Sequence, residues 1–315
     1  MRNHFGRLLL LLVTTSCAHN LLFGLPTRSG CGESADRTYH SSVSEVRLVF
    51  FATDEHNHRV EGLQKDDFAV VDDEMVIRDF RSFNRSAISK LDVIVLFDSS
   101  ESVLPHFKKE MADVLQLISQ WPWNPEDNVS VLSFSGTEVH PICAGDCRSS
   151  FTAERVASLP RGGSTPLFDA LDTATSLLSR RSQPDVWPVI VLFSDGDDTI
   201  SLSSFHGALE KVLASGVQVY AVDISNPGQP SNGTATLQRM ADDSGGRSVR
   251  ISDGAVRIFN NVIEDLHSAY VVTYGLPKSS SDFHSVRILP THNLKLQFRC
   301  RRGYYYRSGS AHLGE

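Results

Sequence analysis

The sequence lacks the features that define several large classes of protein. Its 30 lysine and arginine residues are fewer than its 37 aspartate and glutamate residues, and the two signs are scattered rather than clustered. It therefore has no basic stripe of the kind that binds a phosphate backbone, and we expect no nucleic-acid partner. It also has no Gly-x-Ser-x-Gly motif, which argues against a serine hydrolase.

No apolar run is long enough to cross a bilayer. Near the N-terminus, Arg2 and Arg7 precede the apolar segment Leu8–Val13, and the small-residue segment Thr14–Ala18 follows. This order is typical of a secretory signal peptide that is cleaved after Ala18. A lipoprotein signal, in which Cys17 is lipidated, is the alternative. Either way, we expect a secreted protein or one of the periplasm or cell envelope.

Cysteine is scarce, with five residues in 315. Apart from Cys17, the chain has an even set, which suits disulfide formation in an oxidising compartment. Cys143 and Cys147 flank the turn sequence Ala-Gly-Asp and are expected to close a small disulfide loop. A second bridge, between Cys31 and Cys300, is a hypothesis that would link the two ends of the chain.

The chain has the composition of an ordinary globular protein, 41% hydrophobic and 21% charged. Short strands are expected before Leu91 and after Ala269, and strands alternate with amphipathic helices between them. This alternation predicts an α/β fold, a doubly wound and mainly parallel sheet with helices on both faces. Neither flanking β segment has enough strands to bury a core, so we expect the two to pair into one β-sandwich-like module.

The expected boundaries follow from these changes of pattern. They are a signal peptide at 1–18, a flexible lead-in at 19–42, an N-terminal β segment at 43–85, the α/β domain at 88–268 and a C-terminal β segment at 269–307.

Polar side chains follow the apolar run Val93–Phe97, which is typical of a strand buried on both faces. They are Asp98, Ser100 and Ser102. In an open α/β sheet, ligands bind beyond the carboxyl ends of the strands. The sequence therefore predicts one carboxylate and two hydroxyls at a binding edge.

Two further loops are expected at the same edge. Gly162–Pro166 opens a helix that begins near Leu167, and Ser194–Asp198 follows the apolar run Val189–Phe193. Each has an ordinary explanation. Ser102 suits the N-cap of a helix over residues 103–120, Thr165 suits an N-cap followed by proline, and Asp195 begins a common turn.

Taken together, the three loops supply two carboxylates and three hydroxyls. These all-oxygen ligands suit a hard divalent cation such as Mg²⁺ or Mn²⁺, and they offer nothing to copper or zinc. Because few of the groups are charged, a bound ion would keep positive character. An acidic group of a partner could then complete its coordination shell.

The motifs Asp-x-Ser-x-Ser, Gly-Gly-Ser-Thr-Pro-Leu-Phe-Asp-Ala-Leu and Ser-Asp-Gly resemble those of the von Willebrand factor type A (VWFA) domain and its metal-ion-dependent adhesion site, the MIDAS. The flanking segments Val60–Phe68 and Arg302–Tyr305 resemble exported bacterial proteins grouped as VWFA-related, known from acidobacteria. The resemblance covers residues 43–307. It implies that the metal ligands are Asp98, Ser100, Ser102, Thr165 and Asp195.

The resemblance implies a non-enzymatic protein-binding module whose metal coordinates an acidic group of a partner protein. Glu101 departs from the family, which commonly has glycine there. We expect Glu101, Asp197 and Asp198 to form a solvated acidic rim around the site. His56 and His58 lie in a polar loop with no apparent third ligand and are expected simply to be exposed.

Two other functions are left open by the sequence. A phosphatase of the haloacid dehalogenase type would use Asp98 as nucleophile, but such enzymes have a second aspartate where this chain has Ser100. A structural envelope protein would use the ion only for stability.

Overall fold

The computed structural model describes most of the chain between residues 45 and 305. The described ranges are 45–85, 90–103, 111–112, 114–116, 118–119, 123–143, 147, 159–225, 232–251, 254–277 and 282–305. All of them belong to one compact unit, Val43–Glu315. The expected signal peptide, the lead-in and most of the helix expected over 103–120 lie outside the described residues.

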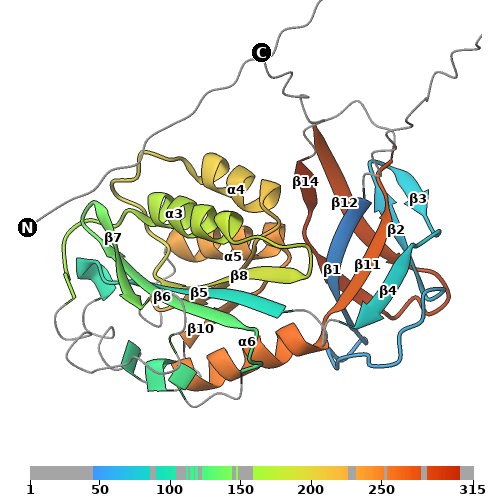
Figure 1. Ribbon diagram of the computed structural model, residues 1–315, viewed down its shortest axis with the longest axis horizontal. Coiled ribbons are helices and arrows are strands. Elements are labelled where there is room, and N and C mark those ends of the chain that lie inside the picture. Colours follow the sequence, from blue (N-terminus) through green and yellow to red (C-terminus); the bar gives the residue numbers. More distant parts are fainter. Residues whose placement is uncertain are drawn as a thin grey trace, which may run out of the picture. The chain divides into compact units, whose positions relative to one another are not determined.

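The α/β part is built on a six-stranded sheet (Figure 1). In spatial order its strands are β10 (Ser248–Arg250), β9 (Gln218–Asp223), β8 (Val186–Ser194), β5 (Lys90–Asp98), β6 (Asn128–Ser135) and β7 (Glu138–Cys143). Five strands are parallel, and β7 runs antiparallel to β6 at one edge. The carboxyl ends of the parallel strands therefore share one edge, where the predicted ligands lie.

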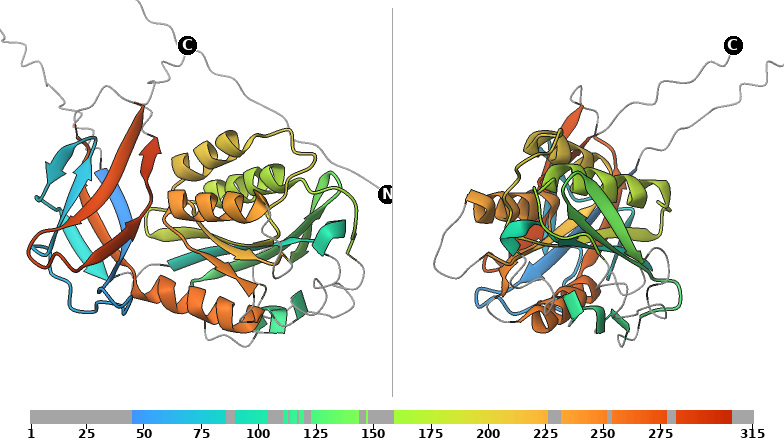
Figure 2. Two further views of the ribbon diagram at one scale, coloured as in Figure 1. Left: turned by 180° about the vertical axis from the view of Figure 1, so that it is seen from behind. Right: turned by 90° about the vertical axis from the view of Figure 1, so that its left-hand side faces the viewer.

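Helices cover both faces of this sheet. On one face lie α3 (Leu167–Arg180), α4 (Phe205–Ala214) and α5 (Asn232–Ser244), and on the other lies α6 (Ala255–Ser268), as Figures 1 and 2 show. Successive residues of β5 alternate between the two cores. Ile94 and Leu96 pack with α3, α4 and α5, whereas Val93 and Val95 pack with α6. The predicted doubly wound α/β fold is confirmed.

Strands from both ends of the described chain form a β-sandwich. One sheet has the order β13 (Gln297–Cys300), β1 (Glu45–Thr53), β11 (Tyr270–Gly275) and β4 (Ser82–Arg85). The other has the order β14 (Gly303–Tyr305), β12 (Phe283–Pro290), β2 (Phe68–Asp72) and β3 (Met75–Ile77). The pairings of β1 with β11 and of β2 with β12 are antiparallel. Each sheet therefore combines N-terminal and C-terminal strands, as expected.

The sandwich core is rich in aromatic side chains. Phe50 and Phe68 lie with ring centroids 4.9 Å apart, and both are almost fully buried. Tyr270 stacks on Phe50 at 5.6 Å. Because the core uses rings from β1, β2 and β11, neither end of the chain could form it without the other.

Three short strands were not expected from the sequence. β4 and β10 are short and carry polar or charged residues, and β7 contains Pro141 and is half exposed. Strands at a sheet edge need little apolar surface, so their sequences show only a weak alternating pattern.

The expected disulfide is present between Cys143 and Cys147, with the Cα atoms 5.6 Å apart. Cys300 carries a free thiol among the described residues. Cys31 lies outside the described residues, so a bridge between the two stays a hypothesis. Burial raises the pKa of the Cys300 thiol to about 12.

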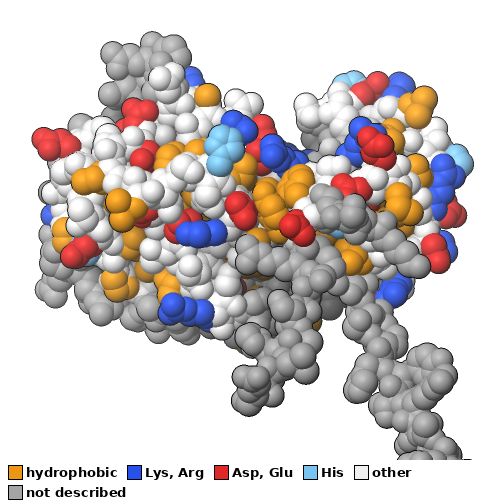
Figure 3. Space-filling view, turned by 90° about the horizontal axis from the view of Figure 1, so that it is seen from above, with side chains coloured by type: hydrophobic (Ala, Val, Ile, Leu, Met, Phe, Trp, Pro, Cys, Tyr) orange, Lys and Arg blue, Asp and Glu red, His pale blue; other side chains and the backbone are white. Residues whose placement is uncertain are grey.

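The surface carries charges of both signs. On the face seen in Figure 3, acidic and basic side chains are interspersed, and neither sign forms a continuous patch. Of the helices in the described ranges, none has the length and apolar character that a membrane span requires.

Candidate metal centre

Asp98 is the last residue of β5, and its side chain is completely buried. One oxygen, Oδ1, accepts the backbone N–H of Ser100 at 2.9 Å. The other, Oδ2, accepts the hydroxyl of Ser194 at 2.7 Å, and that hydroxyl accepts the N–H of Gly196 at 3.0 Å. Since Ser194 ends the neighbouring strand β8, the carboxylate is fixed from two adjacent strands.

The two serines of the first loop lie next to each other. Ser100 is fully buried, and its Oγ is 3.3 Å from the Oγ of Ser102. Ser102 is exposed and belongs to the 3₁₀ turn η2 (Glu101–Val103). The Ser100 hydroxyl thus lies on the protein side of the site, and the Ser102 hydroxyl lies on the solvent side.

The loop before α3 is hydrogen-bonded to the loop after β5. The N–H of Gly162 donates to the carbonyl of Ser99 at 2.8 Å, and the N–H of Glu101 donates to the carbonyl of Gly163 at 3.2 Å. These backbone hydrogen bonds hold the two loops against each other. The positions of their side chains are therefore set by both loops together.

Thr165 joins this loop to the third one. Its carbonyl accepts the N–H of Thr199 at 2.9 Å, and its own N–H donates to the Thr199 hydroxyl at 2.7 Å. The N-cap residue of α3 is Pro166, which makes no side-chain capping hydrogen bond. The expected capping role for Thr165 is therefore wrong, which leaves a buried hydroxyl for another purpose.

Asp195 follows directly after β8 and is 7% exposed. Its Oδ1 accepts the N–H of Asp197 at 3.2 Å. The turn requires Gly196, whose φ is +81° and whose added Cβ would lie 2.2 Å from the carbonyl oxygen of Gly233. The backbone of Gly233 therefore packs closely against the Asp-Gly turn, and only glycine fits there.

The electrostatics of the site call for a cation. Burial raises the pKa of Asp98 to about 6, against the lowering effect of its hydrogen bonds with Ser100 and Ser194, and the charge of Asp195 raises it further. Among the described residues, no Lys, Arg or His forms an ion pair with either carboxylate. In contrast, buried Asp92 lies 3.4 Å from Arg181, and buried Asp223 lies 3.7 Å from Arg250.

The donor chemistry fits Mg²⁺ or Mn²⁺. All five predicted ligands lie at the carboxyl edge of the sheet, on three loops that hydrogen-bond to one another, and all of them offer oxygen. Buried carboxylates without a cationic partner are costly, and a hard divalent ion would offset that cost. The assignment of the five residues as ligands stays a prediction.

The expected acidic rim is only partly as predicted. Glu101 and Asp197 are exposed, but Asp198 is half-buried, and its Oδ1 accepts the Ser201 hydroxyl. Burial raises the pKa of Asp197, and the charge of Asp195 adds to that effect. Asp198 therefore fixes the loop rather than forming part of a solvated rim.

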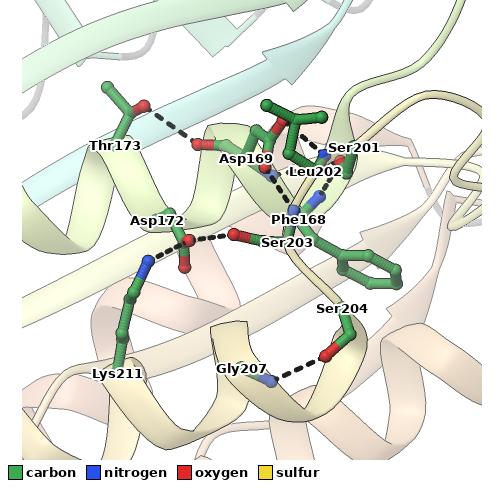
Figure 4. Close-up of polar contacts among 10 residues, drawn as sticks. All are labelled: Phe168, Asp169, Asp172, Thr173, Ser201, Leu202, Ser203, Ser204, Gly207 and Lys211. Carbon is green, nitrogen blue, oxygen red and sulfur yellow. Dashed lines mark hydrogen bonds and ion pairs between the residues drawn. The ribbon is translucent and has the colours of Figure 1, made fainter.

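The loop between Asp195 and α4 is held to α3 by a set of hydrogen bonds (Figure 4). The Asp169 carboxylate accepts the N–H groups of Leu202 and Ser203, both at 2.9 Å. The Ser201 hydroxyl accepts the N–H groups of Phe168 and Asp169, at 3.0 and 3.1 Å. The first turn of α3 thus binds the loop, while Leu202 itself stays 98% exposed.

Lys211 of α4 and the Ser203 hydroxyl both contact the Asp172 carboxylate on α3, which Figure 4 also shows. These contacts attach the end of the loop to two helices.

Two positioning residues were not singled out from the sequence. Ser194 orients the Asp98 carboxylate, and Thr199 holds the backbone of Thr165. The signal for Ser194 was a hydroxyl at the end of a fully apolar strand. Thr199 gave no signal, because its partner lies in a different loop.

A doubly wound sheet with helices on both faces, whose carboxyl edge carries three loops joined by hydrogen bonds, defines a Rossmann-like α/β domain. Residues 92–264 match the profile of the von Willebrand factor type A domain, and the chain belongs to that family.

The chain is also similar to part of a larger curated protein. The magnesium-chelatase 60 kDa subunit of Cereibacter sphaeroides is 26% identical over 163 residues, which cover 48% of this chain and 29% of that protein. The chain therefore spans less than a third of this curated relative.

Two solved structures are similar to parts of this chain. The manganese-loaded TRAP protein of Plasmodium vivax is 14% identical, with a TM-score of 0.43, and the match covers 75% of this chain and 98% of that one. Proximal thread matrix protein 1 from the mussel byssus, with a zinc-occupied MIDAS motif, is 17% identical, with a TM-score of 0.47, and the match covers 62% and 50%.

Proposed function

We propose that this protein is an extracytoplasmic, non-enzymatic module that binds a partner protein through Mg²⁺ or Mn²⁺. Asp98, Ser100, Ser102, Thr165 and Asp195 would hold the ion. An acidic side chain of the partner would complete its coordination. The observation that carries the proposal is the pair of buried carboxylates, Asp98 and Asp195, with no cationic partner among the described residues.

The hardness of the ion, rather than a net charge on the site, favours an acidic ligand. Two carboxylates neutralise a divalent ion, and the three hydroxyls add no charge. If a carboxylate contacts the ion through a water molecule rather than directly, it neutralises the ion less. The ion then keeps more positive character on the side that faces solvent. An acidic group is then the strongest ligand a partner protein can offer to a hard cation.

Leu202 supports a protein rather than a small-molecule partner. Its side chain is 98% exposed, yet the backbone around it is held to α3 by the Asp169 carboxylate. A fixed, fully exposed leucine on the loop that follows Asp195 offers an apolar contact to a partner protein. Such a contact stabilises a complex by removing apolar surface from water.

Export is proposed from the N-terminal pattern of Arg2, Arg7 and Leu8–Val13, and it is supported by the Cys143–Cys147 disulfide. Lipidation at Cys17 would anchor the protein to the envelope.

The loop after Asp98 does not suit the phosphatase alternative. Such enzymes have a second aspartate two residues after the nucleophile, and this chain has Ser100 there, with its Oγ 3.3 Å from the Oγ of Ser102. We therefore propose a binding role for this residue rather than a catalytic one.

The test is calorimetric titration of the full chain with Mg²⁺. We expect saturable binding that Asp98→Ala and Asp195→Ala abolish, while Asp197→Ala, which removes an exposed neighbouring carboxylate, retains it. Circular dichroism confirms that each variant is folded. Unchanged titration in both Asp98→Ala and Asp195→Ala would refute the site.

A second measurement separates partner binding from a purely stabilising ion. The immobilised protein is exposed to an extracellular and envelope fraction with Mg²⁺ or with chelator, and thermal stability is measured in both conditions. Retention that needs both the ion and Asp195 supports the binding function. A large shift in melting temperature without ion-dependent retention supports the structural alternative.

A further inference from the structure

A loop of the β-sandwich brings two imidazoles and a carboxylate together. Residues Asp54–His58 follow β1, and the loop is closed by a hydrogen bond from the N–H of Asp54 to the carbonyl of His58 at 2.9 Å. Thr53 and Arg59 pair across its base. Asn57 adopts a φ of +61°, the left-handed conformation that asparagine tolerates in tight turns. The loop is therefore a defined turn and not an extended connection.

The Asp54 carboxylate is oriented by this turn. Its Oδ1 accepts the backbone N–H groups of His56 and His58, both at 2.8 Å. Its Oδ2 is thereby turned towards the imidazole of His58, whose Nδ1 lies 3.3 Å away. The two imidazole rings lie with centroids 5.9 Å apart at an interplanar angle of 25°.

Asp54 supplies the third ligand that the sequence did not reveal for His56 and His58. One ligand atom from each of the three side chains lies within 4.8 Å of the other two. The expectation that the histidines are simply exposed is thus incomplete, because they are exposed and also grouped around a carboxylate.

The spacing agrees with tetrahedral zinc. With metal–ligand distances of about 2.0–2.1 Å, two ligand atoms of a tetrahedral site lie about 3.3–3.4 Å apart. The Asp54 Oδ2 to His58 Nδ1 separation of 3.3 Å already has this value. His56 is exposed, so its side chain has room to rotate, and its ligand atom already lies within 4.8 Å of the other two.

The surroundings leave the site accessible. Both histidines are exposed, so an ion could enter directly from solvent. The nearby Glu55 carboxylate is engaged by Lys295 at 2.8 Å, which ties the loop to the segment between β12 and β13. Arg59 lies 3.7 Å from Glu264. Lys295 and Arg59 thus each have an acidic partner of their own.

We propose that Asp54, His56 and His58 form a Zn²⁺ site, with a fourth position open to water. Two nitrogen ligands and one oxygen ligand favour Zn²⁺ or another imidazole-binding transition metal over Mg²⁺. The centre at Asp98 and Asp195 has oxygen ligands alone and favours the harder ions. The protein would then carry two sites that differ in metal preference, one on each of its two folded parts.

The test is titration of the tag-free full chain with Zn²⁺ in millimolar Mg²⁺, which occupies the oxygen site. We expect one saturable Zn²⁺ site per chain in the wild type. His56→Ala and His58→Ala should each weaken it at least about tenfold, since even changes outside the ligand set commonly cost 10–100-fold. His206→Ala, which removes an exposed histidine on α4, is the matched control and should leave the affinity unchanged.

A second arm distinguishes this site from the oxygen site. The same titration is repeated on Asp195→Ala, and imidazole resonances are followed by NMR. We expect Zn²⁺ still to bind and to shift the resonances that are missing in His56→Ala and His58→Ala. Zn²⁺ binding that is equal in wild type and both histidine variants, or that Asp195→Ala removes, would overturn the proposal.

Discussion

Asp72 and His284 lie 212 positions apart in the chain, yet Oδ1 of the first and Nδ1 of the second are 2.9 Å apart in the interior of the β-sandwich. The hydroxyls of Tyr274 and Tyr304 donate to Oδ2 of the same carboxylate, at 2.8 and 2.7 Å. One buried carboxylate from the N-terminal strands is therefore surrounded by three groups from the C-terminal strands.

Replacing this carboxylate should destabilise the sandwich strongly. Asp72→Ala leaves two buried hydroxyls and an imidazole without their partner, and loss of one member of a buried charged network costs about 3–5 kcal/mol. Denaturant unfolding measures the change. Asp66→Ala, an exposed carboxylate of the same module, is the control and should change the free energy of unfolding by less than about 0.5 kcal/mol. Equal effects of the two variants would contradict the structural role of Asp72.

Asp98 should make the metal-free protein less stable at neutral pH than at acidic pH. Its folded pKa of about 6 lies above the ordinary value of 3.8, so the folded state binds protons more tightly than the unfolded state. Its contribution to stability is favourable below pH 3.8, declines as the pH rises, and is lost above about pH 6. Asp98→Asn removes the buried charge, and in chelator we expect this variant to be more stable than wild type by about 2–3 kcal/mol at neutral pH.

This difference should shrink as the pH falls towards about 4, because the wild-type carboxyl is then protonated. Unfolding is measured by denaturant titration at several pH values, with Asp66→Asn as the control. An Asn variant that is less stable than wild type at neutral pH without metal would contradict the prediction. With saturating Mg²⁺ the order should reverse, since only the wild type gains stability from the ion.

Glu101 should weaken capture of an acidic partner. Its exposed carboxylate lies between Ser100 and Ser102 and repels incoming negative charge. Glu101→Gln should therefore tighten binding of an acidic partner severalfold at low salt, and the gain should fade as salt screens the interaction. Surface plasmon resonance at two ionic strengths measures it. Glu210→Gln changes an exposed glutamate on α4 and should have no such effect. If Glu101→Gln binds the acidic partner more weakly than wild type, Glu101 favours binding and the prediction is wrong.

Leu202 should contribute to partner affinity without touching the metal. Leu202→Ser removes an apolar side chain that is 98% exposed in the free protein, so the fold should be unaffected. If the partner buries this side chain, the loss is about 1.5–3 kcal/mol, or about tenfold or more in affinity. Mg²⁺ titration should be unchanged.

Leu294→Ser, at a leucine that is 78% exposed in the sandwich, is the matched control for this test. If wild type and Leu202→Ser bind the partner equally well, the partner does not bury Leu202 and the prediction is wrong.

The strands that sequence patterns located well are the fully buried ones. Val93–Phe97 and Val189–Phe193 are continuous apolar runs because helices cover both faces of their sheet, and the structure extends each by only a few residues. The short edge strands β4, β7 and β10 were missed because an edge strand needs little burial. Their place in the sheet depends on neighbouring strands, which a local pattern does not contain.

The sequence alone determined which atoms could reach the candidate site, since Asp98, Ser100, Ser102 and Asp195 each follow an apolar strand and the ends of parallel strands share an edge. Tertiary structure alone decided how they are held. It placed the Ser194 hydroxyl on Asp98, freed Thr165 from helix capping, and turned the Asp54 carboxylate towards His58. Hydrogen bonds between loops and the left-handed turn at Asn57 fix these relations, and neither leaves a periodic signal in the chain.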